Sequence, residues 1–366
     1  MTETEASIAL NMVPNLGPMK LRKLLEVFEE PQRVLLARSG ELRQVDGIGP
    51  DLADAIAHWE KHVDLAAELE RIQSFGASVL TKASPDYPRD LREIHNPPIV
   101  LYVWGTVTER DHRAVSIVGS RKTSHYGLEC AKKLSYQLAY AGLTVVSGLA
   151  RGIDTAAHQG ALAAQGRTIG VIGSGLMDLY PPENAGLAEK MTASGAVVSE
   201  FPMTFPPSPQ TFPYRNRIVA GWGSGLLVVE AGLKSGALIT ATQAVEHGRL
   251  VYAVPGPIDR PTSAGSNRLI QQGAKLVTSA GDILDDMKTL FPEPTKLQRS
   301  AAAPTALSAD ETTVLECLTT SEVNLDFLAG KTGLPIAKVS STLLALELKR
   351  LAKQLPGQQF VRASQS

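Results

Sequence analysis

The sequence is poor in cysteine and lacks long apolar runs. Its only two cysteines, Cys130 and Cys317, lie far apart in the chain, so they can form neither a disulfide framework nor a four-ligand zinc site. No stretch approaches the roughly 18 apolar residues of a membrane-spanning helix. The N-terminal residues 1–13 have no basic segment followed by an apolar one. We therefore expect a cytoplasmic protein that is neither secreted nor inserted in a membrane.

An excess of either charge is also missing. The chain has 36 lysines and arginines against 37 aspartates and glutamates, which gives a net charge of -1. The overall charge therefore does not indicate a nucleic-acid partner, and any electrostatic attraction to one must be local. A composition of 43% hydrophobic and 20% charged residues excludes a wholly disordered or fibrous chain. At 366 residues the chain exceeds one ordinary domain, and its patterns divide it into three.

Residues 1–78 are predicted to form a small all-α domain. Apolar residues such as Leu21 and Phe28 recur at helical spacing, and Gly/Pro pairs interrupt the pattern. Two glycine-bearing turns, at 14–18 and 45–50, each precede a helix and resemble those of helix-hairpin-helix or sterile-alpha-motif modules. In helix-hairpin-helix proteins such turns offer backbone N–H groups to DNA phosphates. A plain helical packing domain explains the same residues, because no dense Lys/Arg cluster flanks either turn.

Residues 79–290 are predicted to form a doubly wound α/β domain with a mainly parallel, Rossmann-like sheet. Apolar β-rich runs alternate with helical stretches that are long enough for right-handed crossovers, which is typical of βαβ units. The expected strands are Val115–Val118, Thr144–Ser147, Thr168–Ile172, Val197–Glu200, Leu226–Glu230, Leu250–Val254 and Lys275–Thr278. The helices between them include Leu128–Ala141, Thr155–Ala164 and Ile239–Glu246.

The rest of the chain is predicted to be a linker and a winged helix-turn-helix domain. Residues 291–308 are rich in Pro, Ala and Ser and lack periodicity, which indicates a linker. Residues 309–366 have the element order of a winged helix. The expected helices and wing lie at 312–318, 325–331, 337–351 and 354–357. Six basic residues against one acidic residue from Lys331 onward suit nucleic acid, but a solvated helix face or a protein-docking module suits them equally.

Gly-Ser turns with arginines follow the expected strands of the α/β domain. In open α/β sheets, ligands bind beyond the carboxyl ends of the strands, where helix N-termini supply backbone donors. Glycine lets a backbone approach a phosphate, serine can donate a hydrogen bond, and arginine binds phosphate bidentately. One such turn alone would indicate only tight helix–strand packing, but three predict an anion-binding rim. The turns are Gly119–Arg121, Ser147–Gly152 with Gly148 and Arg151, and Gly173–Gly175.

A basic and aromatic segment at 212–217, just before a short expected helix, narrows the ligand to single-stranded DNA. Arginines interleaved with aromatic residues suit a strand whose phosphates are neutralised while its exposed bases stack. Duplex DNA, whose bases are hidden, gains less from the aromatic side chains. Ser235 and Gly236 open another expected helix and form a further phosphate nest. The residues of the 212–217 segment that we assign to the site are Phe212, Arg215, Asn216 and Arg217.

The residues do not indicate catalysis, a metal ion or a cofactor. Glu200 and Glu230 each close an expected strand and could form an acid/base pair, but carboxylates beside arginines are commonly structural counter-ions. Asp154 and His158 have the spacing of two metal ligands on one helix face, yet no third ligand is evident, so a helix-start Asp and a packed His are the better interpretation. Neither a Walker A lysine motif nor a complete dinucleotide fingerprint is present. We therefore expect a binding protein and not an enzyme.

Ordered motifs run through the whole α/β region. They are Ser116–Arg121, Ser147–Asp154, Tyr180–Asn184, Ser199–Glu200, Arg215–Val219, Ser235–Thr240 and Pro255–Gly256. Together they resemble the motifs of the DNA-processing protein A family, also called DprA or Smf. The resemblance implies a bacterial protein that binds incoming single-stranded DNA during natural transformation, protects it, and loads the RecA recombinase onto it. It also implies a homodimer formed through the Rossmann-like domain.

The resemblance further implies roles for individual residues. Arg121 would be the main phosphate-gripping residue and Phe212 a base-stacking residue. The backbones of three more residues would form part of the pocket wall: Gly119, Ser120 and Gly148. Electrostatic reasoning extends the set to Arg151, Arg215 and Arg217.

Two positions depart from the family pattern. Leu149 stands where many members have a second glycine, which could stiffen that loop. Pro209 lies near the position where some members present a lysine ahead of the aromatic residue. The affinity for DNA is therefore expected to differ from that of relatives.

Two other functions fit parts of the sequence. The Rossmann variant also resembles nucleotide-processing enzymes of the lysine-decarboxylase-like group, but the comparable segment, Lys234–Thr240, lacks the glutamate that follows the threonine position in those enzymes. A sequence-specific transcription factor that uses the winged helix would leave the arginine-rich rim without a role.

Overall fold

The computed structural model describes the chain in five stretches, which are residues 1–290, 307–319, 323–349, 351–355 and 359–362. The chain folds as two compact units, Met1–Pro294 and Thr295–Ser366. Most of the expected linker, residues 291–306, lies outside the described residues.

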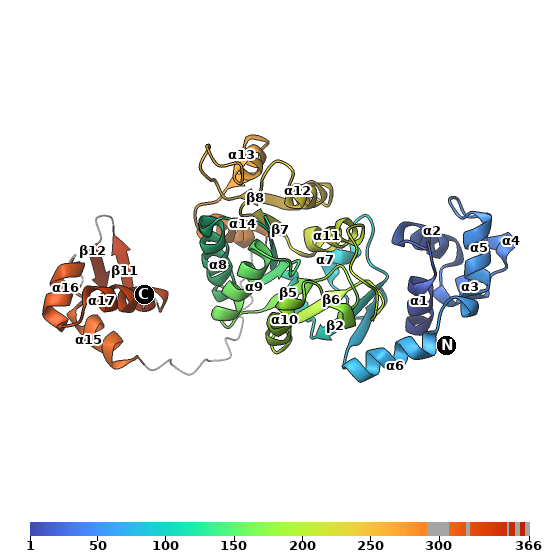
Figure 1. Ribbon diagram of the computed structural model, residues 1–366, viewed down its shortest axis with the longest axis horizontal. Helices are drawn as coiled ribbons and strands as arrows, with labels where there is room; N and C mark the ends of the chain where they lie inside the picture. The colour runs from blue at the N-terminus through green and yellow to red at the C-terminus, as the bar shows by residue number, and fades with distance from the viewer. Residues whose placement is uncertain (291–306, 320–322, 350, 356–358, 363–366) are drawn as a thin grey trace. The chain divides into compact units, whose positions relative to one another are not determined.

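A nine-stranded sheet forms the centre of the first unit (Figure 1). Its strands lie in the order β1-β2-β6-β5-β4-β3-β7-β8-β9. Neighbouring strands from β6 to β9 are parallel, whereas β1, β2 and β6 pair antiparallel at one edge. The prediction of a doubly wound, mainly parallel sheet is therefore confirmed. The strands are β1 (Ser78–Thr81), β2 (Val100–Gly105), β3 (Ala114–Val118), β4 (Thr144–Ser147), β5 (Thr168–Val171), β6 (Ala196–Ser199), β7 (Gly225–Val228), β8 (Leu250–Ala253) and β9 (Lys275–Leu276).

Each strand predicted from the sequence is present, with ends that move by at most two residues. Strands β1 and β2 are not predicted. The segment that joins them contains several prolines and only a four-residue helix, α7 (Arg89–Arg92), so it lacks the βαβ alternation on which the prediction depends.

Helices cover both faces of the sheet (Figure 1). One face packs against α8 (His125–Tyr140), α9 (Ile153–Ala163), α10 (Ala185–Thr192) and α14 (Gly281–Leu290). The other packs against α7, α11 (Thr211–Trp222), α12 (Gly236–Glu246) and α13 (Ala264–Gln271). Because both faces of the sheet are covered by apolar layers, the polar residues lie in the connecting loops, including those at the carboxyl ends of the strands.

The chain reverses its direction of travel across the sheet between β3 and β7. Successive parallel strands run from β3 to β6 in one direction and from β7 to β9 in the other, and β3 pairs with β7. The loops that follow β3 and β7 therefore diverge, and they leave a crevice at the carboxyl ends of the two strands. This is where open α/β sheets bind ligands.

Six short α-helices precede the sheet, in agreement with the helical pattern of the sequence. The two glycine-bearing turns lead into α2 and α5, with Gly17 and Gly49 at the N-caps. These helices do not pack only on one another, because Ile8 of α1 and Ile72 of α6 share an apolar cluster with Tyr102 of β2. The helices are α1 (Glu3–Met12), α2 (Pro18–Phe28), α3 (Pro31–Leu36), α4 (Ser39–Leu42), α5 (Pro50–Ala57) and α6 (Leu65–Phe75).

A buried carboxylate adds a polar link between the helices and the α/β part. The side chain of Glu68, on α6, is fully buried and accepts a 2.7 Å hydrogen bond from the backbone N–H of Met203. Arg71, one turn later, forms a 3.2 Å ion pair with the same carboxylate. The predicted boundary at residue 78 therefore runs through a continuous core.

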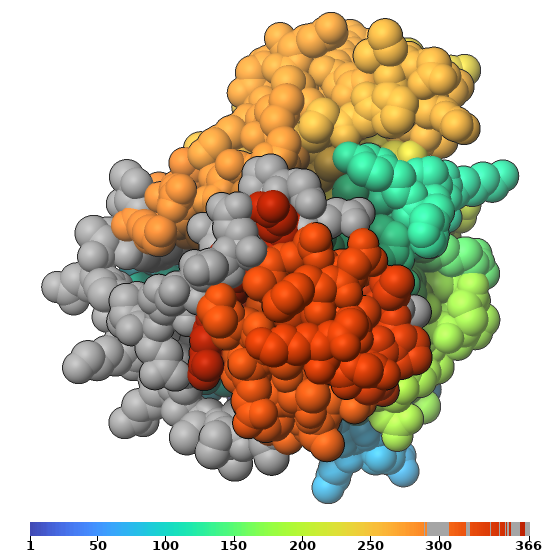
Figure 2. Space-filling view, turned by 90° about the vertical axis from the view of Figure 1, so that its left-hand side faces the viewer, coloured from blue at the N-terminus to red at the C-terminus, as the bar shows by residue number. Residues whose placement is uncertain are grey.

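The second unit has the predicted winged-helix element order. Helices α15 (Ala309–Cys317), α16 (Leu325–Thr332) and α17 (Ile336–Leu348) pack around one apolar cluster. A three-stranded sheet, in the order β10-β12-β11, completes the unit: β10 (Val323–Asn324), β11 (Ala352–Leu355) and β12 (Gln359–Arg362). The tip of the wing, residues 356–358, lies outside the described residues. In the space-filling view the unit presents one rounded surface, coloured orange to red (Figure 2).

Two lysines of this unit form ion pairs with carboxylates of the same unit. Lys338 lies 3.1 Å from Asp310, and Lys349 lies 2.6 Å from Glu311. The excess of basic residues that the sequence shows here is therefore partly neutralised within the unit. In the described stretches of both units, no helix combines the length and the apolar character needed to cross a membrane.

Candidate functional site

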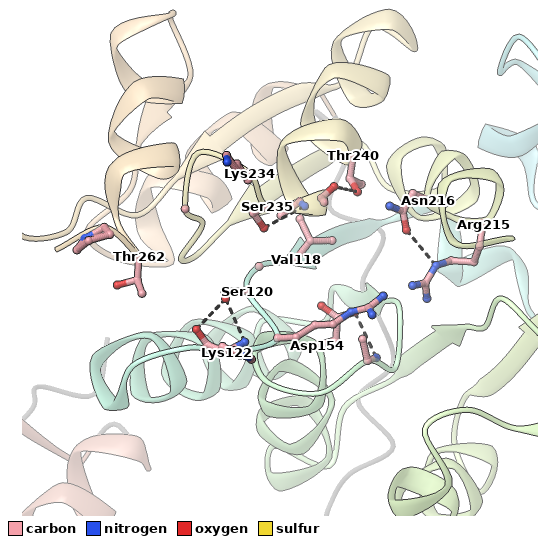
Figure 3. A pocket seen from close by; sticks show the side chains of 17 residues that line it. Val118, Ser120, Lys122, Asp154, Arg215, Asn216, Lys234, Ser235, Thr240 and Thr262 are labelled. Carbon is pink, nitrogen blue, oxygen red and sulfur yellow. Dashed lines mark hydrogen bonds between the residues drawn. The ribbon is translucent and has the colours of Figure 1, made fainter. Parts of the chain in front are cut away.

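A pocket of about 540 Å³ opens in the crevice between β3 and β7 (Figure 3). Ser120 and Lys122 lie on one side of it and Lys234 and Ser235 on the other. Its lining includes most of the residues predicted from the sequence: Gly119, Ser120, Arg121, Arg215, Asn216, Ser235 and Gly236. It also includes Gly232, Lys234 and Thr240, which belong to the same predicted phosphate nest as Ser235 and Gly236 but were not named as site residues. Lys122, Pro261 and Thr262 were not predicted.

The loop after β3 is held tightly in place. The Ser120 N–H donates to the carbonyl of Glu230 at 2.7 Å, and the Ser120 hydroxyl bonds both the N–H and the carbonyl of Lys122. Gly119 has no room for a side chain, because a Cβ atom would lie 2.5 Å from Ile153 and 2.9 Å from the Glu230 carbonyl. This loop therefore presents the side chain of Arg121 from a fixed backbone.

Arg121 is exposed at the mouth of the pocket. Its guanidinium carbon lies 4.7 Å from the centre of the Phe212 ring, which is a cation–π distance. None of the carboxylates in the described stretches forms an ion pair with Arg121, Lys122 or Lys234. These three cations surround the pocket and remain available for an anion.

The carboxylate of Glu230 also holds the loop after β3 in place. It accepts hydrogen bonds from the hydroxyl of Thr123 and, at 2.8 Å, from the N–H of Ser124. Burial opposes its charged form, but hydrogen bonds from Thr123, Thr262 and Ser124 together hold the pKa of Glu230 below its ordinary value. Glu230 is thus an ionised hydrogen-bond acceptor that fixes the loop.

Arg215 forms the floor of the pocket. Its guanidinium is almost fully buried and donates to the carbonyls of Gly148 and Val171. Burial chiefly, and the nearby Arg121, lower its pKa to about 10, so Arg215 is protonated at neutral pH. The neighbouring Asp154 carboxyl is also buried, and burial raises its pKa against the opposing charge of Arg215. Arg215 therefore contributes a buried positive charge to the floor of the pocket, whereas Arg121 is the exposed arginine.

Gly148 makes room for this floor. A Cβ atom at this position would meet the Arg215 guanidinium and would lie 2.6 Å from the Asp154 carboxylate. Gly148 is not among the residues that line the pocket, and it contributes by having no side chain.

Arg217 does not line the pocket, which corrects its assignment to the DNA-binding residues by electrostatic reasoning. Its side chain is buried and forms an ion pair with Glu200, which the sequence analysis favoured as a counter-ion. Arg215 and Arg217 diverge because the segment at 212–217 lies inside α11 and not ahead of it. Residues two apart on a helix point in different directions.

Phe212 and Arg151 belong to the edge of the site. Phe212 lies in the first turn of α11, beside the pocket, with Arg121 over its ring. Arg151 follows β4 but does not line the pocket; it forms an ion pair with Glu183 and donates a 3.3 Å hydrogen bond to the hydroxyl of Tyr180. Their assigned DNA contacts remain proposals.

The N-terminus of α12 forms the opposite wall. Ser235 is its N-cap and accepts a 3.3 Å hydrogen bond from the N–H of Ala237. Lys234, directly before it, is exposed. Like Lys122, it adjoins a Gly-Ser turn in the sequence, and that proximity is the signal by which both lysines could have been assigned to the site.

His158 is a packed core residue, as expected. It is fully buried, and its Nδ1 lies 2.7 Å from the hydroxyl of Thr168. Burial lowers its pKa to about 3, so the ring is neutral at physiological pH. Across the stretches that the structure describes, His, Cys, Asp and Glu form no cluster able to hold a metal ion.

Leu149, where the family pattern has glycine, has a left-handed backbone with φ 55° and a fully buried side chain. We predict that Leu149→Gly lowers the free energy of unfolding by about 2 kcal/mol. Relief of backbone strain contributes about 1 kcal/mol, but the loss of a buried leucine costs about 3 kcal/mol. Urea denaturation followed by circular dichroism measures the change. A variant that is as stable as the unaltered protein would show that strain outweighs packing here.

Family models match both units of the chain. The model for DNA recombination-mediator protein A matches residues 78–288, and the model for the DprA winged helix domain matches residues 298–358. The chain is 34% identical to protein Smf of Synechocystis sp. over 388 residues, which is 97% of this chain and 98% of that protein. It is 38% identical to the DNA processing protein DprA of Streptococcus pneumoniae over 270 residues, with 74% and 93% of the two chains covered.

The chain is also similar to solved structures of DprA proteins. The X-ray structure of DprA from Streptococcus pneumoniae matches with a TM-score of 0.68 at 36% identity and covers 78% of this chain and 99% of that one. DprA from Helicobacter pylori, whose structure is described as showing a single-stranded DNA binding mode, matches with a TM-score of 0.52 at 28% identity. That match covers 59% of this chain and 96% of the other.

Proposed function

Because the chain belongs to the DNA recombination-mediator protein A family, we propose that its pocket binds single-stranded DNA and serves DNA processing in natural transformation. The observation that carries the proposal is the exposed Arg121 lying over the Phe212 ring at the mouth of the pocket. A guanidinium beside an aromatic face suits one phosphate and one unpaired base of the same strand.

The charges around the pocket support a phosphate ligand. Arg121, Lys122 and Lys234 are available cations, and the α12 N-terminus adds backbone N–H groups that favour an anion. Arg215 adds a buried positive charge beneath them. Because the whole chain has a net charge of -1, this local concentration of positive charge attracts an anion to the pocket and not to the protein surface in general.

The wider role follows from the family and is part of the proposal. The protein protects incoming single-stranded DNA in the bacterial cytoplasm and loads the RecA recombinase onto it. It acts as a homodimer joined through the Rossmann-like part, and as a binding protein and not an enzyme. The hydrogen-bonded, ionised state of Glu230 and the burial of Glu200 support this, since neither carboxylate is placed as a free acid or base.

We predict tight binding to single strands, weak binding to blunt duplex and a strong salt dependence. Stacking on Phe212 needs unpaired bases, and phosphate contacts release counter-ions. Contacts from three exposed cations to about three phosphates predict a slope of log K against log salt concentration of about -2. Fluorescence anisotropy with single-stranded and duplex DNA at several salt concentrations measures both effects. Equal affinity for the two DNAs, or steady release of a free base from a nucleoside monophosphate, would overturn the proposal.

A further inference from the structure

Four side chains form a series at the carboxyl ends of the strands: Arg121 lines the pocket, and the other three lie outside its lining. Arg121 lies 4.7 Å from the ring centre of Phe212, and the rings of Phe212 and Tyr180 are 6.2 Å apart at an angle of 49°. The guanidinium carbon of Arg151 lies 5.6 Å from the centre of the Tyr180 ring. The series therefore reads cation, ring, ring, cation, and it begins at the mouth of the pocket.

We propose that this series, Arg121–Phe212–Tyr180–Arg151, is a track on which a single strand continues beyond the pocket. Tyr180 is a second base-stacking residue and Arg151 is a second phosphate contact. The inference rests on the proposed function, because it extends the same DNA strand. Aromatic faces combined with guanidinium groups are the features by which proteins bind single strands without reading their sequence.

The loops that hold the track are joined to one another. Asn184, four residues after Tyr180, donates a 2.8 Å hydrogen bond to the carbonyl of Leu149 and a 2.9 Å hydrogen bond to the hydroxyl of Thr155. These contacts fasten the loop that carries Tyr180 to the loop that carries Arg151. A track with a fixed backbone loses less conformational entropy when it binds.

Glu183 occupies the position that a phosphate would take at the end of the track. It forms an ion pair with Arg151, and both side chains are about half exposed, 49% and 51%. An exposed pair of this kind contributes little to stability, so a phosphate can displace the carboxylate from Arg151. Glu183 is therefore a competitor for the strand and not a ligand of it.

The test compares two lengths of oligothymidylate, one of about four nucleotides that fills only the pocket and one of about twelve that also covers the track. Tyr180→Leu is expected to weaken binding of the longer strand by about tenfold, the effect of losing one base stack, and to leave the shorter strand unchanged. Tyr180→Phe keeps the ring and is expected to bind both as the unaltered protein does. Tyr140→Leu is the matched control, because Tyr140 is an exposed tyrosine at the C-terminal end of α8, away from the pocket and the track.

Glu183→Gln provides an opposite and independent readout. Removal of the competing carboxylate is expected to strengthen binding of the longer strand by about threefold at low salt, with no change for the shorter one. Unchanged affinity of the longer strand in both Tyr180→Leu and Glu183→Gln would overturn the track. So would an equal loss in Tyr180→Phe, or an equal loss for both lengths in Tyr180→Leu. Failure of the unaltered protein to bind either strand would instead overturn the proposed function.

Discussion

Arg121→Glu is expected to lower the affinity for single-stranded DNA by about 100-fold at moderate salt. The substitution removes the one exposed guanidinium that lies over Phe212 and puts a negative charge at the mouth of the pocket. The carboxylate would also face any phosphate held by Lys122 and Lys234, which line the same pocket. The effect should therefore exceed the loss of a single contact.

The salt dependence identifies the cause of this loss. Removing one phosphate contact should reduce the slope of log K against log salt concentration by about 0.7, and fluorescence anisotropy measures slope and affinity together. Arg110→Glu is the matched control. Arg110 is exposed in the turn that precedes β3, and so lies at the amino end of that strand, whereas the pocket lies at its carboxyl end. If Arg121→Glu leaves both slope and affinity unchanged, the strand binds elsewhere.

Arg217→Met is expected to lower the free energy of unfolding by about 3–5 kcal/mol at neutral pH. It leaves Glu200 buried without its partner. Within the described stretches the pair itself is incompletely bonded, because Glu200 Oε1 and Arg217 Nη1 have no hydrogen-bond partner. The double variant Glu200→Met with Arg217→Met should therefore recover most of the stability, since apolar side chains often replace such a pair at little cost.

The pH dependence of the single variant has a definite sign. Burial already raises the pKa of Glu200 above its ordinary value of 4.5, and loss of Arg217 removes the charge that opposes this. The folded state then binds more protons than the unfolded state, so stability falls as the pH rises above the ordinary carboxyl range. Urea denaturation between acidic and mildly alkaline pH should show the variant least destabilised at the acidic end. A destabilisation that does not change with pH would show that Glu200 is not the source.

The sequence predicts the α/β fold and the location of the site more fully than the orientation of its side chains. Gly-Ser turns after β3 and β7 could be placed together because carboxyl ends of parallel strands share one edge, and the structure shows them lining one pocket. The antiparallel strands β1 and β2 depend on long-range pairing that leaves no local period in the sequence.

Arg215 and Arg217 show why side-chain roles were harder to predict. Pro213 suggests that a helix starts after it, yet proline is tolerated in a first helical turn, and α11 begins two residues earlier, at Thr211. The helix turns one arginine to the pocket floor and the other to Glu200. Which of two nearby arginines is buried depends on tertiary packing, and the spacing alone does not contain that information.

The shared core between α1, α6 and β2 limits how this protein can be divided. Cutting the chain at residue 78 would strip Ile8 and Ile72 from Tyr102 and leave the backbone N–H of Met203 without the carboxylate of Glu68. We therefore expect that exchanging the N-terminal helices alone with those of a relative would lower the stability. Any transplant has to carry the complementary surface of β2 with it, so the two parts are expected to change together in evolution.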